Sequence, residues 1–125
     1  VFCNNFRRSA GDIPFGFHFH NTRNTGYANA FAAVAGGASI LDTSIGGIGG
    51  CPFAPGATGN IATEDLFYML QLSGVETGLN ATALLGIVDW LADRIPDKIT
   101  GQLSSAGFFP ALANSFSKLQ KEIRA

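Results

Sequence analysis

Two histidines separated by one residue are the sharpest chemical feature of the sequence. His18 and His20 stand in residues 13–20, where apolar residues alternate strictly with glycine or histidine after Pro14. Alternation with a period of two is typical of a β-strand, and residues two apart on a strand project from the same face. Both imidazoles could therefore reach one metal ion. The alternative is a pair of ordinary strand histidines with hydrogen-bond partners, and the spacing alone leaves both readings open.

A cysteine lies within a glycine-rich stretch. Cys51 belongs to residues 44–59, and the stretch also contains Ile45, Ile48 and Phe53, which flexible linkers rarely have. These residues favour a structured functional loop. A thiol on such a loop could donate or accept a proton at a substrate. The alternative is a small buried hydrophobic residue. A phosphate-binding role is weaker, because neither GxxxxGK[ST] nor GxGxxG is present.

An asparagine and two carboxylates follow the glycine-rich stretch. Asn60 comes directly after Gly59, and its amide oxygen would suit Mg²⁺ or Mn²⁺. The alternative is a turn residue. Thr63, followed by Glu64 and Asp65, predicts a helix start, because negative charge is favourable at the positive end of the helix dipole.

The elements that position these residues are predicted from periodicity. The face of the 13–20 strand opposite the histidines is apolar. Helical spacing follows, and Gly36 and Gly37 are a good helix stop. Residues 38–43 then predict a second strand, so that strand, helix and strand form a βαβ unit with parallel strands. The apolar positions are Phe15, Phe17 and Phe19 on the strand and Tyr27, Phe31 and Val34 on the helix.

Three further helices are expected. One runs from Thr63 to about Gly74. Another is capped by Asn80, ends before Pro96 and has an apolar stripe, and a last one begins near Pro110. We expect Trp90 and most phenylalanines in the core. The stripe of the second helix is Leu84, Leu85, Val88, Leu91 and Ile95, and that of the last helix is Leu112, Phe116, Leu119 and Ile123.

Composition bounds the class of protein. The chain has 125 residues, 46% of them apolar, and a formal net charge of −1, which predicts one modest core and no nucleic-acid surface. No run approaches the roughly 20 apolar residues of a membrane helix, so no membrane association is expected. Cys3 and Cys51 do not suggest a disulfide framework, which favours a reducing compartment. Val1 is expected to continue an element that begins before it.

Residues 12–80 resemble the hydroxymethylglutaryl-CoA lyase family of metal-dependent lyases. The resemblance rests on HFHNT at 18–22, DTSIGGIGGCPF at 42–53 and GATGNIATED at 56–65. The HxH motif is common to a wider group of metallolyases. The GGCP loop with GN-x-ATED behind it resembles the lyase branch specifically.

The resemblance implies an α/β fold, namely the C-terminal part of a (β/α)₈ TIM barrel followed by C-terminal helices. Residues 1–125 would form a partial barrel domain of the pyruvate carboxyltransferase and HMG-CoA-lyase type. Residues 1–79 would supply the last barrel strands and the active-site loop, and residues 80–125 the C-terminal helices. Complete barrels of this kind have about 250 residues. The Asp ligand and the adjacent catalytic Arg of the family's first barrel strand would lie before Val1.

The resemblance also implies roles for five residues. His18, His20 and Asn60 would be ligands of a divalent cation, Mg²⁺ or Mn²⁺, while Cys51 would be the loop thiol that reprotonates the product. Glu64 would lie near the catalytic groups without an assigned step. Asn21 stands where relatives often have Asp, which argues against an outer carboxylate there.

The implied reaction is cleavage of 3-hydroxy-3-methylglutaryl-CoA to acetoacetate and acetyl-CoA, a step of leucine degradation. The expected partners are an acyl-CoA substrate and, in the full-length enzyme, a second copy in a homodimer. The expected compartment is the cytoplasm, with the mitochondrial matrix as the alternative. Two other functions stay open. One is a related enzyme of the same group, an aldolase or synthase, acting on another acyl-CoA or a 2-oxo acid, and the other is a non-catalytic truncated fragment.

Overall fold

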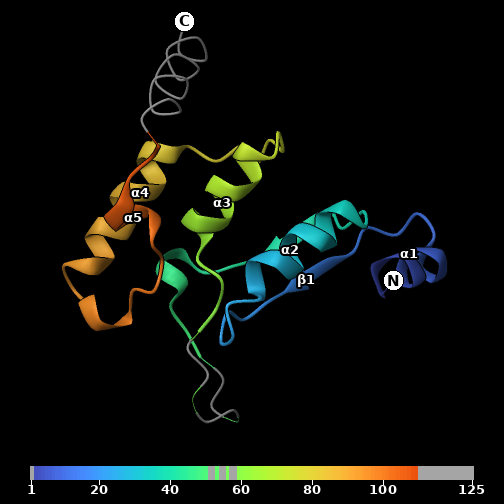
Figure 1. The fold of residues 1–125 in the computed structure, drawn as a ribbon, viewed down its shortest axis with the longest axis horizontal. Helices are drawn as coiled ribbons and strands as arrows, with labels where there is room; N and C mark the ends of the chain where they lie inside the picture. The colour runs from blue at the N-terminus through green and yellow to red at the C-terminus, as the bar shows by residue number, and fades with distance from the viewer. Residues whose placement is uncertain (1, 51–52, 54–55, 57–58, 110–125) are drawn as a thin grey trace, which may run out of the picture.

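The computed structural model describes residues 2–50, 53, 56 and 59–109, and it has an α/β fold. The elements are α1 (Phe2–Ala10), β1 (Gly16–His18), α2 (Gly26–Ala35), β2 (Ile40–Asp42), a 3₁₀ turn η1 (Ile45–Gly47), α3 (Thr63–Leu72), α4 (Ala81–Ala92), a second 3₁₀ turn η2 (Pro96–Lys98) and α5 (Leu103–Ala106). In Figure 1, α1, β1 and α2 lie to one side of the molecule and α3, α4 and α5 to the other.

The predicted βαβ unit is confirmed. β1 and β2 pair in parallel, with Phe17 opposite Leu41 and His18 opposite Asp42, and α2 connects them. The strand predicted over residues 13–20 is, however, too long. Beyond His18 the backbone leaves β2 and pairs with a later segment: the Ile61 amide donates to the Phe19 carbonyl, and His20 forms an antiparallel bridge with Asn60.

The apolar face of the first strand packs on α2, as predicted. Ala30 and Ala33 of α2 are fully buried, and Phe15 is buried beside Ala33. The rings of Phe15 and Phe17 meet edge to face, with centroids 5.9 Å apart. The small alanine side chains of α2 let the helix approach these rings closely. His18 lies on the opposite face of β1.

The helices α3 and α4, which follow the glycine-rich stretch, begin where the sequence predicted. α3 begins at Thr63 and is followed by Gly74 with a φ of 75°. Asn80 caps α4, because its Oδ1 accepts a hydrogen bond from the Ala83 amide at 2.9 Å. Leu84 and Val88 of the predicted stripe are buried. Ile95 lies outside the helix, which ends at Ala92.

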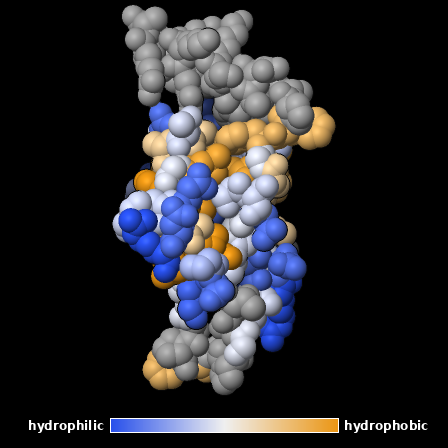
Figure 2. Space-filling view, turned by 90° about the vertical axis from the view of Figure 1, so that its left-hand side faces the viewer, coloured by the Kyte–Doolittle hydropathy of each residue, from blue (hydrophilic) through white to orange (hydrophobic). Residues whose placement is uncertain are grey.

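The expectation that Trp90 belongs to the core is wrong. Its side chain is exposed on α4, and the guanidinium of Arg94 lies 4.0 Å from the ring centroid. An arginine stacked on an indole covers apolar surface without burying it in the core. Several phenylalanines are also exposed, among them Phe6, Phe31 and Phe109. The side of the molecule that carries α4 and α5 accordingly mixes hydrophobic and polar residues (Figure 2).

Two predictions lie outside the described residues, namely the last helix from about Pro110 and the environment of Cys51. The division into residues 1–79 and 80–125 stays a prediction. None of the helices in the described part of the chain is both long and apolar enough to span a membrane.

Candidate functional site

The two histidines lie together at the carboxyl end of β1. Their ring centroids are 5.0 Å apart, and the ring planes are inclined by 72°. His18 is the last residue of β1, and His20 follows in the segment that turns toward Asn60. The two rings therefore lie together, as the sequence predicted, and both can present a nitrogen atom to one metal ion.

Asp42 orients the ring of His18. The two residues are opposite each other in the parallel strands, and His18 Nδ1 lies 2.9 Å from Asp42 Oδ2. An ionised carboxylate only accepts hydrogen bonds, so in this contact Nδ1 is the donor, and in a neutral imidazole Nε2 then keeps its lone pair. This is the arrangement by which outer carboxylates orient metal-binding histidines. Sequence reasoning did not identify Asp42, although aligning the two predicted strands in parallel would have placed it beside His18.

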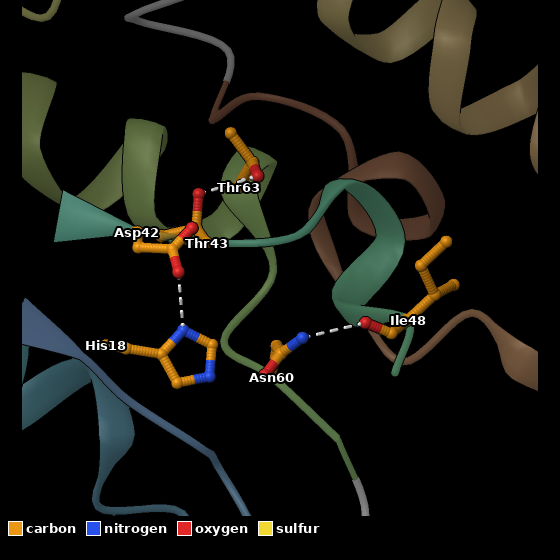
Figure 3. A network of polar contacts seen from close by, with 6 residues as sticks. All are labelled: His18, Asp42, Thr43, Ile48, Asn60 and Thr63. Atoms are coloured by element: carbon orange, nitrogen blue, oxygen red, sulfur yellow. Dashed lines mark hydrogen bonds and ion pairs between the residues drawn. The ribbon is translucent and has the colours of Figure 1, made fainter. Parts of the chain in front are cut away.

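Asn60 joins the histidines from a distant part of the chain. Its backbone forms an antiparallel bridge with His20, and its side-chain Nδ2 donates to the Ile48 carbonyl at 3.0 Å. That hydrogen bond fixes the amide, whose Oδ1 is buried and has no hydrogen-bond partner among the described residues. In Figure 3 the ring of His18 and the amide of Asn60 lie on the same side of the segment that ends β2.

Tyr27 holds the segment that carries Asn60. Its hydroxyl accepts a hydrogen bond from the Ala62 amide at 2.9 Å and donates to Asp65 Oδ2 at 3.1 Å. Burial raises the pKa of the Tyr27 phenol, and the neighbouring carboxylates of Asp65 and Glu64 raise it further. Tyr27 therefore stays protonated and remains a donor. The sequence identified Tyr27 only as an apolar helix position, and nothing in its spacing indicated this contact.

Glu64 is buried at the base of the glycine-rich stretch. Its exposed fraction is 0%, and its Oε2 accepts a hydrogen bond from the Gly46 amide at 2.9 Å. Removal from water raises the pKa of this carboxyl, the Gly46 hydrogen bond opposes that rise, and the charge of Asp65 adds to it. The contact that the structure gives Glu64 is with the loop. A catalytic role for it stays a prediction, as does that of Cys51.

The donor set at this edge consists of two imidazoles and one amide oxygen. No group of three or more His, Cys, Asp or Glu side chains that could hold a metal is found within residues 2–50 and 59–109 or at positions 53 and 56. A cation held by His18, His20 and Asn60 would therefore need further ligands from substrate, water or another part of the protein. An orphaned amide oxygen next to two imidazoles fits that kind of open site.

Comparison with known proteins covers most of the chain. A sequence model of the family described as HMGL-like matches residues 3–91. The chain is 49% identical to the (R)-citramalyl-CoA lyase of Chloroflexus aurantiacus over 96 residues, which are 77% of this chain and 30% of that protein. It is 42% identical to the mitochondrial hydroxymethylglutaryl-CoA lyase of Mus musculus, over 71% of this chain and 27% of that protein. The chain thus spans less than a third of the curated relatives that it matches.

A solved structure shares the backbone arrangement. The HMG-CoA lyase of Acinetobacter baumannii, in complex with coenzyme A and 3-methylmalate, is 38% identical and superposes with a TM-score of 0.80. The match covers 86% of this chain and 35% of that one. This confirms the predicted fold class, an α/β segment that forms part of a (β/α)₈ barrel. The names of relatives give two compartments, mitochondrial for the mouse protein and cytoplasmic for one from Danio rerio.

Proposed function

Because this chain belongs to the HMGL-like family of lyases, we propose that it supplies part of the active site of a divalent-metal-dependent carbon–carbon lyase. The observation that carries the proposal is the meeting of His18, His20 and the orphaned oxygen of Asn60 at one edge of the sheet. The proposal concerns the complete protein, of which the relatives suggest this chain to be about one third.

His18, His20 and Asn60 would hold the cation, Mg²⁺ or Mn²⁺. When bound, the cation would act as a Lewis acid toward the oxygens of a hydroxy acid. Asp42 keeps the Nδ1 proton of His18, so that Nε2 is the nitrogen available for coordination. The hydrogen bond from Asn60 to the Ile48 carbonyl keeps the amide oxygen in place.

The bond cleavage needs one proton removed and one delivered. A base removes the proton of the tertiary hydroxyl, the carbon–carbon bond breaks, and a ketone forms. The electron pair of the broken bond stays on the α-carbon of acetyl-CoA and must take up a proton. We assign that delivery to the thiol of Cys51, on the loop whose ends lie beside Asn60.

The substrate we propose first is 3-hydroxy-3-methylglutaryl-CoA, which would give acetoacetate and acetyl-CoA. The 49% identity to a citramalyl-CoA lyase supports a second candidate, because citramalyl-CoA is shorter by one methylene and would give pyruvate and acetyl-CoA. One methylene in a binding site is worth about 1–3 kcal/mol, or roughly 10- to 200-fold in kcat/KM. The two candidates therefore differ in rate and in the second product.

The test is product analysis with both thioesters in the complete protein, supplied with Mg²⁺ or Mn²⁺. We expect acetyl-CoA from one or both, with acetoacetate favoured if the first proposal is right. Pyruvate as the favoured product would assign the second candidate instead. Absence of acetyl-CoA from both would refute the lyase proposal and favour a non-catalytic protein.

Three further expectations accompany this proposal. They are an acyl-CoA as the bound partner, a homodimer of the complete protein, and a cytoplasmic or mitochondrial location. Size-exclusion chromatography with light scattering would test the dimer directly.

A further inference from the structure

The backbone N–H and C=O groups of one residue, Gly46, hold the glycine-rich stretch near its first end. We call residues 44–49 the loop root and residues 99–103 the strap. The amide of Gly46 donates to Glu64 Oε2 at 2.9 Å, and the carbonyl of the same residue accepts from the amides of Thr100, at 2.8 Å, and Gly101, at 3.3 Å. Gly46 has a φ of 71°, which a residue with a side chain rarely adopts. The root is thus fixed on both sides of a single glycine.

The strap seals the carboxyl group that holds the root. A Cβ added at Gly101 would overlap Glu64 Oε1, so the strap can lie against the carboxyl only because residue 101 has no side chain. The strap is held by the next residue of α3, since the Asp65 carboxylate accepts from the amides of Gln102 and Leu103 at 2.8–2.9 Å. Two consecutive carboxylates therefore bind two different segments, Glu64 the root and Asp65 the strap.

A simple helix-dipole contact does not explain this burial. A carboxylate in the first turn of α3 would interact favourably with the helix dipole from a solvated position. Full burial of Glu64 costs free energy, and its Oε1 has no hydrogen-bond partner among the described residues. That cost is consistent with a role that needs the specific contact to Gly46.

We propose that Glu64 is a positioning residue. Sealed by the strap at Gly101, Glu64 fixes the loop root and thereby the direction in which the glycine-rich stretch continues from the root. The catalytic consequence rests on the proposed function, because the same stretch carries Cys51. The strap follows α4 and lies far in sequence from the motifs of the glycine-rich stretch, yet it thereby helps to orient the loop.

Hydrogen exchange measured by mass spectrometry tests the positioning directly. In the complete protein, Glu64→Leu removes the acceptor for the Gly46 amide at similar volume, whereas Glu64→Gln keeps an acceptor oxygen. We expect exchange in residues 44–49 to rise about tenfold or more in the Leu variant, as for one lost hydrogen bond, and to rise much less in the Gln variant. Equal exchange in the wild type and the Leu variant would overturn the proposal. So would a uniform rise across all helices, which would indicate general destabilisation.

A matched pair of glycine substitutions tests the strap and does not depend on the folding of the Leu variant. Gly101→Ala places a methyl group against Glu64, while an added Cβ at Gly86, in α4, meets no atom within 4 Å. We expect faster exchange at residues 44–49 in Gly101→Ala and no change there in Gly86→Ala. Identical exchange in the two variants would refute the role of the strap.

Turnover separates this inference from the proposed function. If the wild type is an active lyase, Glu64→Leu should lower kcat up to about 100-fold, the loss that a misplacement of about 1 Å can cause, with a smaller change in KM. An unchanged kcat would refute the catalytic consequence. If the wild type is inactive while exchange behaves as expected, the positioning role is supported and the lyase proposal alone fails.

Discussion

Two clusters of polar groups flank the glycine-rich stretch and differ in burial. The donor cluster consists of His18, His20 and Asn60, and the root cluster consists of Glu64, Gly46 and the strap. The side chains of His18 and its partner Asp42 are 44% and 72% exposed, whereas Glu64 is 0% exposed. In the donor cluster one hydrogen bond fixes the side chain of His18 and another fixes that of Asn60, and the Asn60 amide oxygen has no partner among the described residues. In the root cluster the chain itself surrounds the polar group. Imidazoles that are open to solvent indicate a ligand site, while a carboxylate enclosed by the chain indicates a positioning role.

The largest effect should come from removing a donor. His20→Ala would take one nitrogen from the proposed cation site, and we expect activity of the complete protein to be lost together with most of its Mn²⁺ affinity. Mn²⁺ binding followed by electron paramagnetic resonance, alongside turnover, measures both.

Gly86→Ala is a suitable control, because it changes an exposed position of α4 where an added Cβ meets no atom within 4 Å. If His20→Ala bound Mn²⁺ as tightly as the control, His20 could not be a ligand. The difference in burial between the donor cluster and the root cluster would then not indicate a difference in function.

An intermediate effect is expected from the residue that only orients a donor. Asp42→Asn keeps the shape of the side chain but weakens the hydrogen bond from His18 Nδ1. Loss of such an outer partner costs about 10- to 100-fold in metal affinity or activity. Metal titration of Asp42→Asn measures this loss. Asp89→Asn, on the exposed surface of α4, is the matched control variant. Equal affinity in the two variants would exclude an orienting role for Asp42.

The smallest effect concerns pH and the enclosed cluster. Burial raises the pKa of Glu64 in the folded protein, so the folded state binds this proton more tightly than the unfolded chain does. The free energy of unfolding should therefore fall as pH rises from the ordinary glutamate pKa of about 4.3 through the raised value. Glu64→Gln removes this group from titration. Denaturant unfolding from pH 4 upward should show a smaller decline for the variant, and parallel curves would contradict a raised pKa.

Local patterns predicted the parts of the fold that depend on local physics. Alternation placed β1, helical spacing that ends at Gly36 defined α2, and Asn80 marked the start of α4 by the hydrogen bond that it makes. The predicted strand was too long, because its end depends on which segment pairs with Phe19, and that segment lies about forty residues later. Periodicity carries no information about such a partner.

The site was predicted in the same uneven way. His18, His20 and Asn60 stood out by residue type and spacing, but Asp42 became visible only once the register of the parallel strands was known. The strap was not predicted at all. Its contacts use backbone amides of Gln102 and Leu103, and any residue but proline has such a donor.

The two ends of the glycine-rich stretch are tied to each other as well as to the rest of the fold. Asn60 donates to the Ile48 carbonyl, and a Cβ added at Gly59 would lie only 2.6 Å from the Gly47 carbonyl oxygen. The fold therefore fixes the end-to-end separation of the intervening chain independently of that chain's own sequence. Closing a chain segment between fixed ends becomes costlier by only about 0.6 kcal/mol for each doubling of its length. Insertions between the ends would thus be tolerated thermodynamically, and proteins with this frame could diversify what they recognise by changing loop length while keeping the same donors.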